Sequence, residues 1–175
     1  SAEDIVVKVI ADSGEVGFGN APPTAVITGD SQDSIIGAIR DTIGPKLIGM
    51  EVDHLEEIMT VLDASMLHNQ SAKAALDIAV YDLFGKRYGL PLYKLFGGYR
   101  SEMTTDLTIS LNGPEEMVRD SLEAVAAGYT ALKIKVGNDA ALDIQRVKAI
   151  REAVGPDILI RLDANQGWTP KEAVR

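Results

Sequence analysis

The stretch ALKIKV, residues 131–136, alternates aliphatic and lysine side chains with the period of two that is typical of a β-strand. The alternation places Lys133 and Lys135 on one face and the aliphatic side chains on the other. Helical periodicity before and after it, over residues 115–127 and 140–153, predicts helices that pack against the strand. We therefore expect a central parallel strand, in which two lysines on a covered face need a chemical reason.

The same pattern continues on both sides of this strand. LTISL, residues 107–111, and ILIRLD, residues 158–163, predict two further short strands. The order β-α-β-α-β-α favours parallel strands with right-handed crossovers, either in an open doubly wound sheet or at the start of a (β/α)8 barrel. A closed barrel needs eight strands and typically about 250 residues, so in a barrel this chain would stop at the third unit.

A last helix has a start signal but no stop signal. Thr169 is a candidate N-cap, Pro170 takes the first helical position, and Glu172 takes the capping-box position. Arg175 then ends the sequence in mid-helix. We therefore expect further sequence beyond it, in a protein that is truncated after the third strand.

The first part of the chain has a different pattern of predicted strands and helices. A β-branched run at residues 5–10 and a second short strand at 16–19 predict a hairpin. Apolar residues at helical spacing then predict helices over residues 34–43, 52–66 and 72–88. A hairpin followed by helices predicts an α+β unit that precedes the β/α region.

Composition and charge limit the classes of function. The chain has 175 residues, of which 46% are hydrophobic and 25% charged, as in soluble globular proteins. Its net charge of -9 argues against a nucleic-acid partner, because such proteins normally carry a basic face. No stretch approaches the roughly 18 apolar residues that span a bilayer, and no signal-peptide pattern opens the sequence. The lack of cysteine excludes disulfides and thiolate metal sites, and we expect a cytoplasmic protein without membrane partners.

The two lysines of the central strand are candidates for acid–base chemistry. At the carboxyl end of a barrel strand, alternate side chains open onto the mouth of the active site. There, mutual repulsion and desolvation lower the pKa of a lysine, so that one of a pair can remove a proton near neutral pH. The alternative is a half-exposed strand whose two lysines are solvated.

A second candidate site follows the third predicted strand, in LDANQGW at residues 162–168. Asp163 lies where that strand should end, and its carboxylate is a natural ligand for a hard cation such as Mg²⁺. Asn165 could add a polar group to the same site. One carboxylate cannot hold Mg²⁺ alone, so further ligands would have to come from further strands. The alternative is that Asp163 only caps the following turn.

Other polar and glycine-rich features are expected to be structural. The pieces GFGN, residues 17–20, and GGYR, residues 97–100, match neither a P-loop nor a dinucleotide fingerprint, so we predict turns there. Four titratable residues lack partners at metal-ligand spacing: His54, His68, Asp77 and Asp82. We expect these four on the surface or at element boundaries.

The KIK of the second predicted strand, LDANQGW after the third, and the preceding α+β region together resemble the muconate-lactonizing subgroup of the enolase superfamily. Four further phrases extend the resemblance, and they look most like L-Ala-D/L-Glu (dipeptide) epimerases. These are APPTAVITGDS (21–31), SAKAALDIAVYD (71–82), GLPLY (89–93) and GGYR (97–100). The resemblance implies an α+β capping domain over residues 1–100, without its first strand and substrate loop. The first three β/α units of a TIM-type barrel would follow over residues 101–175.

The resemblance also implies roles for individual residues. Lys135 would exchange a proton with the substrate α-carbon, and Lys133 would neutralise the substrate carboxylate. Asp163 would be the first of three acidic Mg²⁺ ligands, with Asn165 supporting that site. Thr108, inward on the first strand, matches a position that touches substrate. The family's opposite-face lysine, its other two acidic ligands and its substrate-reading loops do not occur in this sequence, so we expect the 175-residue piece alone to be inactive.

The implied function is Mg²⁺-dependent epimerisation of dipeptides such as L-Ala-D/L-Glu, through an enediolate, in recycling of cell-wall peptides. An N-acylamino acid racemase, an o-succinylbenzoate synthase or a muconate cycloisomerase of the same superfamily would keep both lysines and Asp163. A different hypothesis is a non-catalytic fragment that binds no Mg²⁺ and associates through exposed strand edges. Homo-oligomerisation also stays open, because the family often forms symmetric assemblies.

Overall fold

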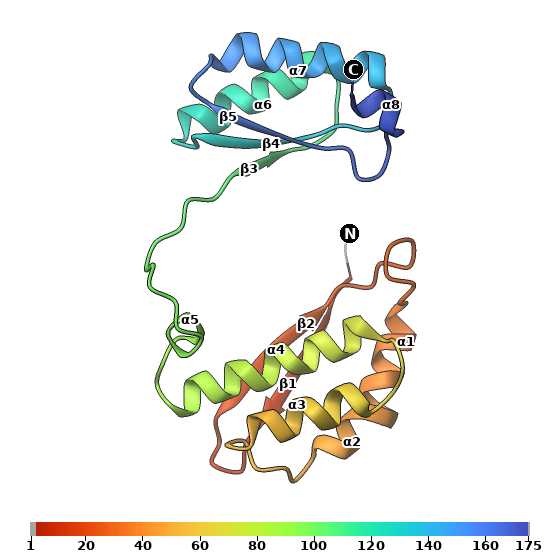
Figure 1. The fold of residues 1–175 in the computed structure, drawn as a ribbon, viewed down its shortest axis with the longest axis vertical. Helices are drawn as coiled ribbons and strands as arrows, with labels where there is room; N and C mark the ends of the chain where they lie inside the picture. Colours follow the sequence, from red (N-terminus) through yellow and green to blue (C-terminus); the bar gives the residue numbers. More distant parts are fainter. Residues whose placement is uncertain (1–2, 175) are drawn as a thin grey trace. The chain divides into compact units, whose positions relative to one another are not determined.

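A computed structural model of the chain describes residues 3–174, which form two compact units (Figure 1). The first unit comprises Ser1–Ser101 and the second Glu102–Arg175. Each unit has its own buried apolar cluster, as expected of separately packed cores. Among the described residues, no helix is both long and apolar enough to cross a membrane.

The first unit opens with an antiparallel hairpin. Strand β1, Ile5–Ile10, pairs along its whole length with strand β2, Val16–Ala21. Gly14 lies in the turn between them with φ +96°, a backbone conformation that side chains with a Cβ rarely adopt. The predicted hairpin is confirmed, and its second strand extends two residues beyond the predicted end.

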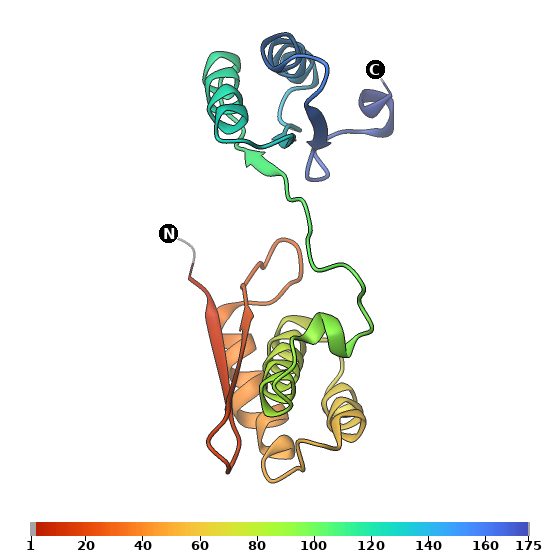
Figure 2. The same ribbon diagram turned by 90° about the vertical axis from the view of Figure 1, so that its left-hand side faces the viewer.

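Helices lie on one side of this hairpin, and α4 packs directly against both of its strands (Figures 1 and 2). They are α1 (Gln32–Gly37), the π-helical stretch η1 (Ala38–Ile43), α2 (Gly44–Leu47), α3 (Leu55–Ala64), α4 (Gln70–Arg87) and α5 (Leu92–Leu95). The first three form one continuous helical segment where the sequence predicts a single helix over 34–43. The Gly44 amide donates to the Ile39 carbonyl, an i to i−5 bond that marks the π-helical turn. Pro45 follows in the first turn of α2 and donates no backbone hydrogen bond, because proline has no N–H.

The prediction of a turn at GFGN is wrong, because these residues lie within β2. A Cβ on Gly17 would lie 1.9 Å from the carbonyl oxygen of Ala79, and a Cβ on Gly19 would lie 1.9 Å from that of Ala75. The two glycines therefore allow the β2 backbone to contact helix α4 directly. Both alanines are fully buried, so small residues on the two elements make this close packing possible.

The second unit is a three-stranded parallel sheet with helices between the strands. Its elements are β3 (Leu107–Ile109), α6 (Pro114–Ala126), β4 (Ala131–Lys135), α7 (Ala140–Val154), β5 (Leu159–Asp163) and α8 (Pro170–Ala173). The order β3-β4-β5 makes β4 the central strand, as predicted. Helices α6 and α7 lie together over one face of the sheet (Figures 1 and 2). The predicted capping box of α8 is also present, with Thr169 and Glu172 bonding reciprocally.

The two faces of β4 differ as the alternation predicts. Leu132, Ile134 and Val136 are at most 4% exposed and belong to the apolar cluster under the helices. Lys133 and Lys135 point to the opposite face, which no helix among residues 102–174 covers. The expectation that the lysines lie on a covered face is therefore wrong for these residues, because both helices pack on the aliphatic side of the strand. The face that packs and the face that carries polar groups are thus separated by the strand's own geometry.

Candidate active site

The uncovered face of the second unit gathers polar side chains from all three strands. In the parallel register, Thr108 of β3 lies beside Lys133 of β4, and Lys133 lies beside Arg161 of β5. One step further along the strands, Lys135 lies beside Asp163. Neighbouring residues in register point to the same side, so the sheet brings these groups into two adjacent rows.

Asp163 joins the two lysines at the carboxyl end of the strands. Its Oδ2 atom lies 2.9 Å from Lys133 Nζ and 2.8 Å from Lys135 Nζ. Hydrogen bonds from Lys135 and Lys133, with a third from the Asn165 amide, hold the pKa of Asp163 well below its ordinary value. The carboxylate is therefore fully ionised at neutral pH.

Asn165 completes the cluster from the loop after β5. Its side-chain oxygen accepts a hydrogen bond from Lys135 Nζ at 2.6 Å, and its backbone amide donates to Asp163 Oδ1 at 3.0 Å. The residue has φ +45°, in the left-handed region that asparagine tolerates better than most residues. Asp163 thus both caps the turn and contacts the lysines, since Oδ1 accepts from the turn and Oδ2 faces the two ammonium groups.

Thr108 lies on the same face as Lys133 and is exposed. This position leaves its hydroxyl accessible on the polar face, and its contact with substrate stays a prediction.

An ion pair that the sequence analysis missed begins at Arg161, in the same row as Thr108 and Lys133. Arg161 Nη1 lies 3.0 Å from Asp106 Oδ2, so the pair connects β5 with the residue before β3. Period-two spacing places both residues on the polar face, because Arg161 stands two residues before Asp163 and Asp106 two before Thr108, but it does not predict their contact. The pair neutralises itself, which leaves the ammonium groups of Lys133 and Lys135 against the single carboxylate of Asp163. This corner of an acidic chain therefore carries an excess positive charge that suits an anionic ligand.

The oxygen donors of this cluster suit Mg²⁺ in kind but not in number. Carboxylate and amide oxygens, as in Asp163 and Asn165, are the ligands that this cation prefers. Within residues 3–174, however, no three histidine, cysteine or acidic residues come close enough together to hold a metal ion. The described residues can therefore supply part of such a site and not all of it.

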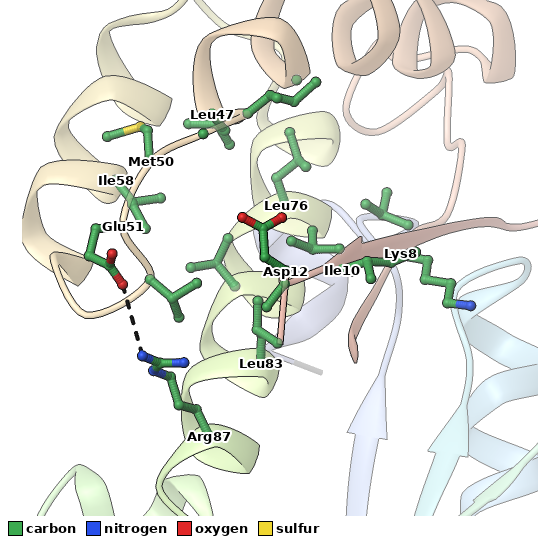
Figure 3. Close-up of a pocket in the computed structure, with 18 of the residues that line it drawn as sticks. Lys8, Ile10, Asp12, Leu47, Met50, Glu51, Ile58, Leu76, Leu83 and Arg87 are labelled. Atoms are coloured by element: carbon green, nitrogen blue, oxygen red, sulfur yellow. Dashed lines mark ion pairs between the residues drawn. The ribbon is translucent and has the colours of Figure 1, made fainter. Parts of the chain in front are cut away.

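The first unit contains a cavity of a different character (Figure 3). Its volume is about 610 Å³, and aliphatic side chains line much of it, among them residues of β1, α2, α3 and α4. Figure 3 shows Arg87 at its edge facing Glu51, and the Arg87 guanidinium also lies 2.7 Å from Asp53. Arg87 is thus paired with acidic residues, and the lining contains Lys8 but no lysine pair like that of β4.

The remaining titratable residues have structural surroundings. Asp82 accepts from the Phe18 amide at 2.8 Å and pairs with Lys86, which ties β2 to α4. Asp77 is partly buried, and burial together with nearby Asp63 raises its pKa. His54 stands at the N-cap of α3, where it lies 3.4 Å from Glu57. These contacts support the predicted structural roles.

An α+β unit followed by parallel β/α units, with paired lysines and a carboxylate at the carboxyl strand ends, defines an enolase-type chain. Two family models match it: "Mandelate racemase / muconate lactonizing enzyme, N-terminal domain" over residues 1–97, and "Enolase C-terminal domain-like" over residues 116–175. The chain belongs to the mandelate racemase/muconate lactonizing enzyme family. The resemblance found in the sequence is therefore confirmed.

Individual relatives agree with this assignment. The chain is 55% identical to the L-Ala-D/L-Glu epimerase of Clostridium acetobutylicum, over 100% of this chain and 49% of that protein. A substrate-liganded structure of the L-Ala-D/L-Glu epimerase from Bacillus subtilis matches with a TM-score of 0.94 at 49% identity, covering 99% of this chain and 48% of that one.

A third match is the dipeptide epimerase from Enterococcus faecalis in complex with Mg and L-Leu-L-Tyr. It has a TM-score of 0.93 at 44% identity, covering 99% of this chain and 49% of that one. The chain thus spans about half the length of the curated relatives it matches.

Proposed function

We propose that this chain supplies the proton-transferring half of a dipeptide epimerase, with Lys135 as the base that removes the α-proton. One observation carries the proposal: Lys135 Nζ is held 2.8 Å from Asp163 and 2.6 Å from Asn165 on the uncovered face of the central strand. The high identity to epimerases of L-Ala-D/L-Glu supports the choice of substrate class. This reaction makes the protein an isomerase.

The proposed step needs Lys135 as a neutral amine. Its nitrogen lone pair takes the α-proton, the C–H bond breaks, and the electron pair delocalises into the adjacent carboxylate as an enediolate. Lys133 shares the same carboxylate partner, Asp163, and its ammonium group would neutralise the substrate carboxylate. Thr108, beside Lys133 in register, would contact the substrate from β3.

We further propose that Asp163 contributes one ligand to Mg²⁺, supported by Asn165. When bound, the cation would stabilise the negative charge that develops on the substrate carboxylate. The dipeptide epimerase of Enterococcus faecalis, which this chain resembles, is described in complex with Mg. The other ligands would have to come from outside these 175 residues, in the rest of a TIM-type barrel.

Inversion of a carbon also needs an acid or base on its opposite face. The polar cluster of residues 102–174 supplies lysines on one face only. We therefore propose that the 175-residue chain alone does not complete an epimerisation cycle. The whole enzyme would act on dipeptides from cell-wall recycling.

Two groups of alternatives remain. Racemases, synthases and cycloisomerases of the superfamily would use the same lysine pair, so the cluster does not distinguish them. A non-catalytic fragment would not require two lysines to share one ionised carboxylate, and this arrangement favours catalysis.

A chimaera provides the test of the reaction class. The 175 residues replace the segment that they match in the Bacillus subtilis epimerase, and the product is assayed with L-Ala-L-Glu, an N-acylamino acid and muconate. Conversion of L-Ala-L-Glu to L-Ala-D-Glu, followed by NMR, is the expected result. Preference for either other substrate would replace the dipeptide proposal, and a folded chimaera that converts none of them would favour the non-catalytic hypothesis.

A further inference from the structure

A buried ion pair lies beneath the lysine cluster and is not used by the proposed chemistry. Asp143 is 1% exposed and Arg146 is 7% exposed, and both lie on helix α7. Arg146 Nη1 lies 2.8 Å from Asp143 Oδ1. Two charged side chains this deeply buried are costly to desolvate, so their remaining polar contacts indicate what they do.

Those contacts reach the loops that follow all three strands. Asp143 Oδ2 accepts from the Gly137 amide at 2.8 Å, just after β4, and from Trp168 Nε1 at 3.0 Å, in the loop after β5. Arg146 Nε donates to the Asn112 carbonyl at 2.8 Å, after β3. The Asp143 carboxylate therefore bonds to the loops after β4 and β5, and the Arg146 guanidinium bonds to the loop after β3.

The backbones of two of these loops also touch. A Cβ on Gly137 would lie 2.2 Å from the Ala164 carbonyl oxygen, and one on Gly167 would lie 2.1 Å from the Gly137 carbonyl oxygen. Glycine at both positions allows the loops after β4 and β5 to pack without side chains between them. Lys135 and Asp163 are the last residues of β4 and β5, immediately before these loops.

We propose that Asp143 and Arg146 are positioning residues, a buried clamp that holds the three loops together and thereby sets Lys135 against Asp163 and Asn165. The functional part of this inference rests on the proposed proton transfer. The mechanical part concerns the loops alone. A displacement of about 1 Å at a reacting centre can reduce a rate about 100-fold. A clamp that fixes the position of Lys135 therefore affects catalysis without touching the substrate.

The mechanical part can be measured in the chain itself, because Trp168 is its only tryptophan. Asp143→Asn keeps the side-chain volume but removes the charge that binds the indole. We expect hydrogen exchange of the Trp168 indole N–H to accelerate by roughly tenfold or more, the factor that a lost charge-assisted hydrogen bond produces. The matched control is Asp139→Ala, which removes the N-cap of the same helix and none of the loop contacts.

Equal indole exchange in Asp143→Asn and Asp139→Ala would overturn the clamp. In the chimaera with the Bacillus subtilis enzyme, Asp143→Asn is expected to lower kcat by roughly 10–100-fold with little change in KM, whereas Asp139→Ala lowers only the melting temperature. If Asp143→Asn does not fold, Trp168→Phe replaces it as the test variant, because it removes only the indole N–H that donates to Asp143. An unchanged kcat in Trp168→Phe would contradict the positioning role. An unsubstituted chimaera without epimerase activity would count against the proposed function, while the indole measurement would still decide the clamp.

Discussion

Replacing Ile134 by alanine tests the separation of packing and polar faces on which the site depends. Ile134 is fully buried in the cluster beneath α6 and α7. The substitution removes three carbon groups at about 0.8 kcal/mol each, or about 2.4 kcal/mol, and the cavity left behind adds to this. We expect a total loss of about 3–4 kcal/mol in the free energy of unfolding of the second unit.

The matched control is Lys133→Ala, one residue away on the opposite face. Lys133 keeps 38% of its side chain exposed and forms one ion pair there, so its removal should change stability by less than about 1 kcal/mol. Urea unfolding followed by Trp168 fluorescence reports on this unit, because the chain has no other tryptophan. A loss from Lys133→Ala as large as that from Ile134→Ala would refute the assignment of the two faces.

Three further predictions concern the charge cluster and the first unit. The folded-state pKa of Asp163 lies below its ordinary value, so the contribution of this carboxylate to stability is present above about pH 4 and is lost as the pH falls further. Asp163→Asn should therefore reduce the acid-induced fall in the free energy of unfolding, measured by urea unfolding. An unchanged fall would contradict the ion pairs of Asp163 with the two lysines. In the chimaera, Asp163→Asn should raise the Mg²⁺ concentration needed for half-maximal activity by roughly 10–100-fold, and an unaltered requirement would remove Asp163 from the metal site. Gly19→Ala should destabilise the first unit by about 1–3 kcal/mol, because the new Cβ would meet the Ala75 carbonyl, and thermal unfolding followed by circular dichroism measures this loss. Gly37→Ala is the control: open space surrounds this position in helix α1, so the substitution should be neutral or stabilising.

The sequence predicts the second unit well because its strands follow one simple rule. Period-two alternation separates Lys133 and Lys135 from the aliphatic residues between them, and helices on both sides require a parallel order with β4 in the centre. Asp163 could be placed at the strand end for the same reason. Its contact with both lysines follows from register, which single-strand patterns do not contain.

The sequence does not predict the role of a residue when that role depends on contacts with a distant segment of the chain. Gly17 and Gly19 look like turn residues locally, but helix α4 packs on them from about 60 positions further along the chain. Asp143 and Arg146 look like an ordinary exposed i,i+3 pair on a helix, and only the folded loops make them buried. Arg161 and Asp106 are joined only when three strands align.

The central claim is that Lys135 carries the proton. Its most direct test is the rate at which the chimaera exchanges the α-proton of the glutamyl residue of L-Ala-L-Glu in D₂O, measured by ¹H NMR with and without Lys135→Ala. Lys148→Ala, an exposed lysine on α7, is the control that removes an ammonium group elsewhere in the same unit. The account predicts that exchange falls by at least about 100-fold in Lys135→Ala and stays unchanged in Lys148→Ala. Full exchange in a folded Lys135→Ala variant would contradict the assignment of Lys135 as the base.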